Sequence, residues 1–197
     1  MKHRLPLLML AIIAALFSQA QKLHFGLKTD FNFTNNIGQG LAKNFKSGFD
    51  VGGFSEMNFN KKWGLQPEVL FSQRNTNRAD NFTTYYVTEG YRFANMDVQL
   101  CYVSIPVLVR YMVNDIVTVN FGPEYNVLVY DNENLLTTNK NAFTKIDAGL
   151  AGGIQLNLSS FSMFGRYYYG FANINNIDNR YKWHTQQLQA GIGYRIF

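Results

Sequence analysis

Cysteine and histidine are scarce in this chain, and their scarcity excludes several kinds of site. Cys101 is the only cysteine, so the chain has no internal disulfide and no cysteine cluster for a metal. Only two histidines, His24 and His184, follow the first twenty residues. No metal-ligand spacing stands out, and no glycine-rich phosphate loop occurs in a strand–helix setting. We therefore expect no metal and no cofactor, and we interpret Cys101 as a small apolar residue.

Strong charge and long apolar segments are also missing. The formal net charge of +5 falls to +3 without Lys2 and Arg4, and the charges are evenly spread. This balance does not predict nucleic acid as a partner. After residue 17 no apolar run approaches the roughly 20 residues that a transmembrane helix needs.

The first twenty residues have the pattern of an export signal. Lys2 and Arg4 precede an apolar stretch at 5–17, and small residues occupy the two positions that determine cleavage, Ser18 and Ala20. The stretch is short for a membrane anchor. The sequence thus predicts a cleaved signal peptide at 1–20 and one mature domain at 21–197.

Helical periodicity is absent beyond the signal, and alternation with a period of two replaces it. Apolar and polar residues alternate in eight segments, which predicts eight strands. They lie at 23–33, 48–59, 63–73, 97–113, 116–129, 143–158, 162–171 and 185–197. Short connections at 60–62, 114–115 and 159–160 alternate with long polar ones at 34–47, 74–96, 131–142 and 173–184. This pattern predicts an all-β fold: an eight-stranded antiparallel up-and-down transmembrane β-barrel of the outer membrane, with short periplasmic turns and long extracellular loops.

Three features of the alternation indicate which face of the strands points inward. Glycines gather on the polar face, where they ease crowding in a narrow barrel. Aromatic residues lie toward the strand ends, as at the two lipid–water interfaces. The polar face also carries near-balanced charges, as a closed interior requires. We predict an interior charge network of Lys28, Asp30, Glu56, Glu68, Arg110, Glu124, Asp147, Arg166 and Arg195. Within it, Glu56, Glu68 and Arg110 are expected at similar depth.

The alternatives to a closed membrane barrel are a soluble-type ligand-binding barrel and a channel. A soluble barrel places its apolar face around a ligand cavity. A channel needs an aqueous lumen, which only wider barrels leave. The crowded, charged interior that we expect argues against both.

The last strand runs to the chain's final residue, Phe197. One face carries Leu188, Ala190, Ile192 and Tyr194, and the other carries Gln189, Gly191, Gly193 and Arg195. We expect this segment to close the barrel against the first strand and to serve as the signal for the barrel assembly machinery. Extending the chain past Phe197, or replacing it by a charged residue, should therefore impair assembly.

Several strands resemble those of the PorT-like outer-membrane β-barrel family of Bacteroidetes. Residues 102–111, Tyr-Val-Ser-Ile-Pro-Val-Leu-Val-Arg-Tyr, are similar to its Tyr-Leu-x-Ile-Pro-Leu-Leu-x-Lys-Tyr strand. Residues 64–72, Gly-Leu-Gln-Pro-Glu-Val-Leu-Phe-Ser, are similar to its Leu-Gln-Pro-Glu-Leu-x-Tyr-Ser strand. Ser104 departs from the pattern, because the family often has Glu there, and Ile196 is an extra residue before the terminal Phe. The resemblance implies an eight-stranded outer-membrane barrel; some members serve secretion linked to gliding.

The long connection at 74–96 is the candidate interaction site. Its aromatic residues and arginines suit a recognition surface and equally suit a cap over the barrel. The residues concerned are Arg74, Arg78, Phe82, Tyr85, Tyr86, Tyr91 and Arg92. Residues 83–87 are expected to extend the flanking strands as a hairpin.

An enzyme that modifies lipids at the outer rim is the rival interpretation. Such an enzyme needs a histidine paired with Ser or Asp. His24 and His184 are predicted at opposite ends of the barrel, roughly 25 Å apart, so they cannot share a site. We therefore expect no catalysis. The expected role is structural or a surface interaction, with a secretion component as the alternative. The expected partners are outer-membrane lipids, lipopolysaccharide and an extracellular or secretion-system protein.

Overall fold

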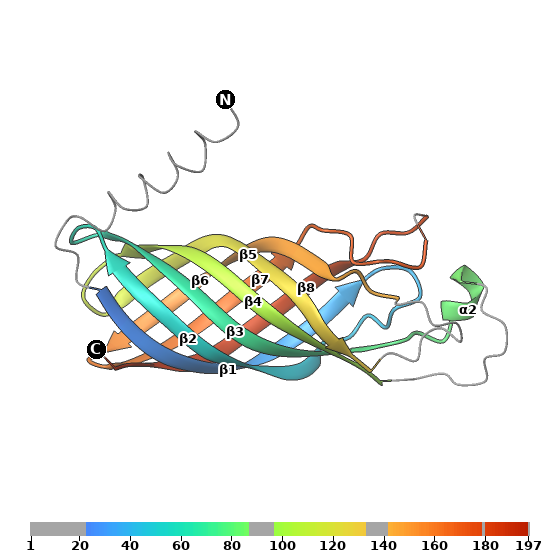
Figure 1. The fold of residues 1–197 in the computed structure, drawn as a ribbon, viewed down its shortest axis with the longest axis horizontal. Coiled ribbons are helices and arrows are strands. Elements are labelled where there is room, and N and C mark those ends of the chain that lie inside the picture. The colour runs from blue at the N-terminus through green and yellow to red at the C-terminus, as the bar shows by residue number, and fades with distance from the viewer. Residues whose placement is uncertain (1–22, 87–96, 133–141, 179, 197) are drawn as a thin grey trace, which may run out of the picture.

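The chain forms a closed barrel of eight antiparallel strands, each paired with its neighbours in sequence order (Figure 1). The computed structural model describes residues 23–86, 97–132, 142–178 and 180–196, so the predicted signal peptide and Phe197 lie outside the described residues. The strands are β1 (Leu23–Ile37), β2 (Lys46–Asn58), β3 (Trp63–Asn77), β4 (Asp97–Met112), β5 (Val117–Asp131), β6 (Ile146–Leu158), β7 (Phe161–Gly170) and β8 (His184–Arg195). The predicted fold class is confirmed, including closure of β8 against β1.

Strand register agrees with the predicted seam. Gly193 lies opposite Lys28 and Gly191 lies opposite Asp30 across the β1–β8 pair. The short turns gather at one end of the barrel, where β1 begins, and the long connections gather at the other (Figure 1).

Several strands run further toward the long-connection end than the apolar pattern predicts. β1 continues to Ile37 and β3 to Asn77. The added residues are mostly polar, yet they remain paired, as Asn35 with Gln186 and Asn75 with Gln99 show. These segments lack an apolar face, and backbone hydrogen bonds between the strands hold them in the sheet. The barrel wall therefore extends past the apolar part of its outer surface.

The outer wall of the barrel is apolar, and the lumen is polar. Along β3, Val69 and Phe71 are exposed on the outside, whereas Gln66, Glu68 and Ser72 are buried inside. The same alternation runs around the barrel; Phe31, for example, is 71% exposed. A soluble-type barrel would have the opposite arrangement, so this alternative is excluded.

Phe54 breaks the apolar-out pattern, and the structure shows why. Its side chain points into the lumen, where it is 7% exposed. The ring occupies the space above Gly26, because a Cβ on that glycine would meet the ring and lie 2.5 Å from the Tyr194 carbonyl oxygen. Glycine on the inner face therefore makes room for an aromatic ring from the neighbouring strand.

Substitution of this glycine gives a direct test of lumen crowding. We expect Gly26→Ala to lower the free energy of unfolding by about 1–3 kcal/mol, because the added methyl group overpacks the lumen. The matched control is Gly165→Ala on the outer wall, where a Cβ would meet nothing within 4 Å. Denaturant titration in lipid vesicles measures both. Equal effects of the two substitutions would contradict a crowded lumen.

Helical structure is minor in this barrel. A single turn of helix, α2 (Phe82–Tyr85), follows β3 beyond the barrel wall (Figure 1). The predicted hairpin at 83–87 is therefore wrong for residues 83–86, and residue 87 lies outside the described residues. Among the described residues, no helix is long and apolar enough to cross a membrane.

Candidate functional site

The middle of the lumen holds a carboxylate between two cations. Glu68 accepts a bidentate pair of hydrogen bonds from Arg166, at 2.8 and 3.0 Å, and two from Lys28 Nζ, at 2.9 and 3.1 Å. Gln66 Nε2 donates a further hydrogen bond of 2.7 Å to Glu68 Oε1. All of these side chains are buried. The cluster therefore fills the lumen with mutually satisfied charge.

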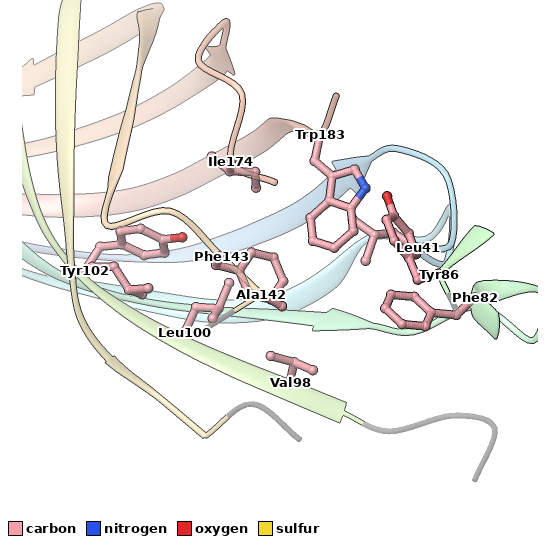
Figure 2. Packing of buried hydrophobic residues seen from close by; sticks show 11 residues of the cluster. Leu41, Phe82, Tyr86, Val98, Leu100, Tyr102, Ala142, Phe143, Ile174 and Trp183 are labelled. Carbon is pink, nitrogen blue, oxygen red and sulfur yellow. The ribbon is translucent and has the colours of Figure 1, made fainter. Parts of the chain in front are cut away.

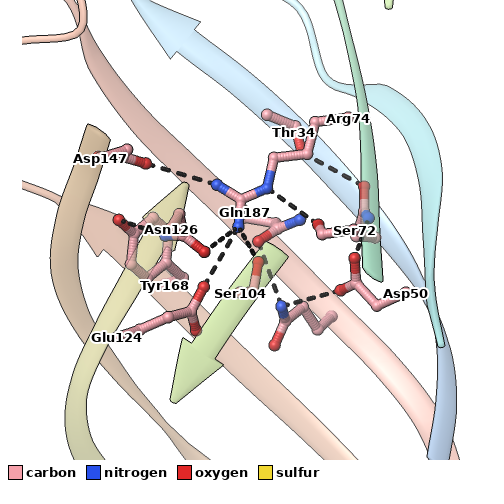
Figure 3. A network of polar contacts seen from close by, with 12 residues as sticks. Thr34, Asp50, Ser72, Arg74, Ser104, Glu124, Asn126, Asp147, Tyr168 and Gln187 are labelled. Carbon is pink, nitrogen blue, oxygen red and sulfur yellow. Dashed lines mark hydrogen bonds and ion pairs between the residues drawn. The ribbon is translucent and has the colours of Figure 1, made fainter. Parts of the chain in front are cut away.

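A second cluster surrounds Arg74 nearer the long-connection end (Figure 3). Its guanidinium forms ion pairs with Glu124 at 3.2 Å and with Asp147 at 3.4 Å. It also donates to Ser104 Oγ at 3.2 Å, so the serine that departs from the PorT-like pattern serves as a neutral acceptor. Further contacts with Ser72 and Asn126 complete the arrangement.

A third cluster lies near the short-turn end. Glu56 pairs with Arg110 at 3.0 Å and with Arg195 at 3.1 Å. Glu56, Glu68 and Arg110 all point into the lumen, as predicted, but Glu68 belongs to another cluster, because it pairs with Lys28 and Arg166. The tilt and stagger of barrel strands bring these residues of distant strands together.

These clusters account for the charged residues predicted inside the barrel. Asp30, the remaining member, is buried opposite Asp50 across the β1–β2 pair. Arg195 differs from the others, because its side chain keeps 28% exposure at the mouth. Together the clusters form a polar plug along the lumen.

The long connections build a buried apolar core of their own, here called the cap core (Figure 2). Its members come from all four connections and from the upper parts of β4 and β5. They are Leu41, Phe82, Tyr86, Val98, Leu100, Tyr102, Leu128, Ala142, Phe143, Ile174 and Trp183. Such burial is typical of a folded unit and not of independently moving loops.

Trp183 packs against the rings of Tyr86 and Phe143 within the cap core (Figure 2). It is fully buried and packs edge-on against Tyr86, with ring centroids 5.7 Å apart. Its indole Nε1 donates to the Gln39 carbonyl oxygen at 3.1 Å, which joins the last connection to the first. Gly38 lies directly against the indole, where a Cβ would collide with it. One side chain thus ties three connections together.

Backbone hydrogen bonds link the connections in pairs. The first and second are joined by Ala42 N to Asn77 O and by Ala79 N to Gly40 O, both at 2.9 Å. The third and fourth are joined by Asn176 N to Ala142 O at 2.9 Å and by Thr144 N to Ile174 O at 3.0 Å. The cap is therefore held by backbone pairing as well as by apolar packing.

Most of the residues predicted for the interaction loop are buried, so the recognition-surface interpretation of these residues requires correction and the cap interpretation fits them. Arg74 belongs to β3 and lies in the lumen, because that strand is longer than predicted. Arg78, Phe82 and Tyr86 are buried in the cap, with the Arg78 guanidinium 5.0 Å from the centre of the Phe82 ring. Tyr85 alone among the described ones is partly exposed. Tyr91 and Arg92 lie outside the described residues.

A partly exposed patch remains on the cap, formed by half-buried Tyr85, Ile177 and Tyr181, which pack against the cap core, and by exposed Arg180; we call it the cap patch. Tyr85 and Tyr181 stack edge-to-face at 5.4 Å, and Arg180 donates to the Tyr85 carbonyl oxygen at 3.3 Å. Arg180 also pairs with Asp178 at 2.8 Å while its own side chain remains 65% exposed. Sequence reasoning missed Arg180 and Tyr181, although aromatic residues in a polar connection were the available signal.

Ionisation of groups in the cap follows their surroundings. Burial raises the pKa of the Tyr86 phenol, so this residue remains a neutral hydrogen-bonding partner of Asn175. Partial desolvation opposes ionisation of Asp178, but the hydrogen bonds from Arg180 outweigh it and lower the pKa of this carboxyl. The Asp178–Arg180 pair therefore stays charged around neutral pH and fixes the arginine within the cap patch.

The two histidines are at opposite ends of the barrel. His24 is in the first residues of β1, and His184 begins β8 beside the Tyr169 ring, with centroids 6.3 Å apart. They do not form one site. Within the described ranges, no group of three His, Cys, Asp or Glu side chains is placed to hold a metal ion.

Comparison with known families identifies the type of barrel. The sequence model of the outer membrane protein beta-barrel domain matches residues 17–176. This chain belongs to that family. The apolar outer wall of the barrel is accordingly its lipid-facing surface, and the protein is located in the outer membrane. By the general orientation of this family of barrels, the short turns face the periplasm and the cap faces outward.

Solved structures of outer-membrane barrels share the fold. The neisserial surface protein A aligns with a TM-score of 0.56 at 13% identity, covering 87% of this chain and 97% of that one. OprG of Pseudomonas aeruginosa gives 0.53 at 15% identity, covering 89% and 97%. Ail of Yersinia pestis, solved with the heparin analogue sucrose octasulfate, gives 0.52 at 15% identity, covering 88% and 99%. Among curated proteins, no sequence matches at a significant level.

Proposed function

We propose that this protein is a closed, non-catalytic outer-membrane barrel that presents a rigid cap to a protein partner outside the cell. The observation that carries the proposal is the cap core, in which all four long connections share one buried apolar cluster. A surface that is already ordered loses little conformational freedom when it binds. The polar plug fits the same role. Its side chains fill the lumen, so the barrel supports the cap and leaves no open path for a solute.

The cap patch is the surface that we propose for contact. Tyrosine and arginine are enriched among residues that dominate binding energy at protein interfaces. Here Tyr85, Arg180 and Tyr181 are held against one another before any partner arrives. A rigid aromatic surface beside a fixed arginine favours a protein surface with apolar and acidic groups.

A photocrosslinking experiment in living cells tests this role. A benzophenone amino acid replaces Tyr181, and the matched control replaces Tyr130, an exposed aromatic residue at the far end of β5. We expect a discrete protein adduct at position 181, which Arg180→Ala weakens by about tenfold or more, as removal of an interface hot spot does. The control should give no such adduct.

The opposite result has a clear meaning. Identical adducts at positions 181 and 130, or none at 181 in a correctly inserted barrel, would contradict recognition through the cap patch. The cap would then be only a lid over the plug.

The finer affiliation with PorT-like barrels is also a proposal. The strands at 102–111 and 64–72 support it, through their Ile-Pro and Gln-Pro-Glu elements. Under this affiliation the partner would belong to secretion. Genes for secretion proteins next to the gene of this protein would support that role. Without such neighbours, an extracellular protein outside a secretion system would be the expected partner.

A further inference from the structure

The short-turn end of the barrel contains a polar pocket of about 330 Å³. Glu56, Arg110 and Arg195 line its inner part, and Lys61, Asp115 and His24 lie around it. Further up the lumen, the buried cluster of Lys28, Glu68 and Arg166 closes the way through. The pocket thus opens toward the periplasm and ends within the barrel.

Charge in this pocket is unbalanced toward the positive. Arg110 and Arg195 both pair with one carboxylate, that of Glu56. Lys61 adds a third cation, against Asp115 as the second acid. Three cations therefore face two anions before His24 is considered. The cluster around Arg74 has the opposite balance, since this one arginine faces two carboxylates.

The guanidinium groups also retain hydrogen-bonding capacity. Among the described residues, neither Arg110 Nε nor Arg195 Nε has a hydrogen-bond acceptor. Arg110, Arg195 and Gln155 already share the two oxygens of Glu56, and neither Nε–H group reaches them. Arg195, whose side chain is 28% exposed, is the member of the cluster that solvent reaches.

We infer that this pocket binds a small oxyanion from the periplasm, a phosphate or carboxylate group, with Arg195 as its main contact. An arginine fork matches the two oxygens of such a group, and Lys61 contributes long-range attraction at the rim. The anion restores charge balance at the mouth. Because the pocket has no exit through the plug, it retains its ligand as a binding site and does not conduct it.

Titration of the purified barrel tests the inference. The protein is held in maltoside micelles without phosphate, and arginine Nε–H resonances are followed by NMR while inorganic phosphate or acetate is added. We expect a saturable shift of the Arg195 resonance. A response to phosphate alone assigns a phosphorylated ligand, and a response to both anions assigns a carboxylate as well.

Three variants are expected to change the affinity for phosphate differently: one weakens it, one strengthens it and one leaves it unchanged. Isothermal titration measures the affinity in each. Arg195→Gln should weaken it about tenfold, the value of one charge-assisted hydrogen bond. Glu56→Gln removes the competing carboxylate and should strengthen binding by a similar factor. Lys145→Gln, on the exposed outer end, should change nothing. Gel mobility before and after heating verifies folding of each variant.

Two outcomes would overturn the inference. One is a wild-type barrel without a saturable response to either anion. The other is equal weakening by Arg195→Gln and Lys145→Gln, which would indicate general attraction to a cationic protein. Arg195→Gln leaves Glu56 paired with Arg110, so this variant remains informative even where Glu56→Gln fails to fold.

Discussion

Replacing Glu68 by leucine is expected to lower the free energy of unfolding by about 3–5 kcal/mol. Glu68 is the shared partner of Lys28 and Arg166, and both cations are buried with it in the middle of the lumen. Without the carboxylate, two like charges remain in a space that water does not reach. The lost hydrogen bonds are secondary, because the larger cost is the uncompensated charge.

Urea titration in lipid vesicles, followed by gel mobility with and without heating, measures this effect. Lys145→Leu is the matched control, because Lys145 is exposed beyond the plug. A triple variant with apolar residues at 28, 68 and 166 should recover most of the loss, since no charge of this cluster remains without its partner. A loss below about 1 kcal/mol in Glu68→Leu would contradict a water-free plug.

Replacing Trp183 by alanine is expected to release the cap while the barrel stays folded. Removing a buried tryptophan costs about 3–5 kcal/mol. Here we expect the substitution to lower the free energy of opening the cap and not that of unfolding the barrel, because Trp183 contacts cap residues such as Tyr86 and Phe143. We expect amides of the cap to exchange about 150 to 4,000 times faster with solvent, the factor that corresponds to this free energy.

Protection of strand amides provides the internal reference for this variant. Amides in the middle of the barrel should be unaffected in Trp183→Ala, and the heat-dependent gel shift should remain. Tyr130→Ala, on the exposed outer wall, is the control for loss of an aromatic side chain. Barrel unfolding in Trp183→Ala would show that cap and barrel are one cooperative unit, contrary to this account.

The barrel itself was predictable because its pattern is local and repeated. Each strand alternates between lipid and lumen, so a side chain such as Val69 or Glu68 reveals its face by parity alone. Glycines and balanced charges on one face then identified the lumen. Phe54 broke this rule because a neighbouring glycine, Gly26, offers space that parity cannot reveal.

Partnerships within the lumen could not be predicted in the same way. Glu68 and Arg166 are 98 residues apart in sequence, and only the stagger of the closed barrel brings them together. The cap core was missed for a similar reason. Leu41, Ile174 and Trp183 are isolated apolar residues in polar connections, and no periodicity marks them. Their common burial depends on how the barrel places four connections at one end.

The strands extend further toward the long connections than the sequence predicted, and this changes where one candidate site residue lies. Asparagine and glutamine at the upper ends of β1, β3 and β8 lack the apolar face that signals a strand, yet they pair across the sheet. Arg74 was therefore assigned to a loop, although it belongs to β3 and holds Glu124 and Asp147 in the lumen.

Amide hydrogen exchange of the wild-type barrel in lipid nanodiscs is the most direct test of the central claim, that the four connections form one rigid cap. The relevant amides are those of Ala42, Ala79 and Asn176, each bonded to another connection or to the neighbouring strand at 2.9 Å. The account predicts that all three exchange slowly and at similar rates, as members of one cooperative unit. Exchange of these amides at the rate of an unstructured peptide would contradict it.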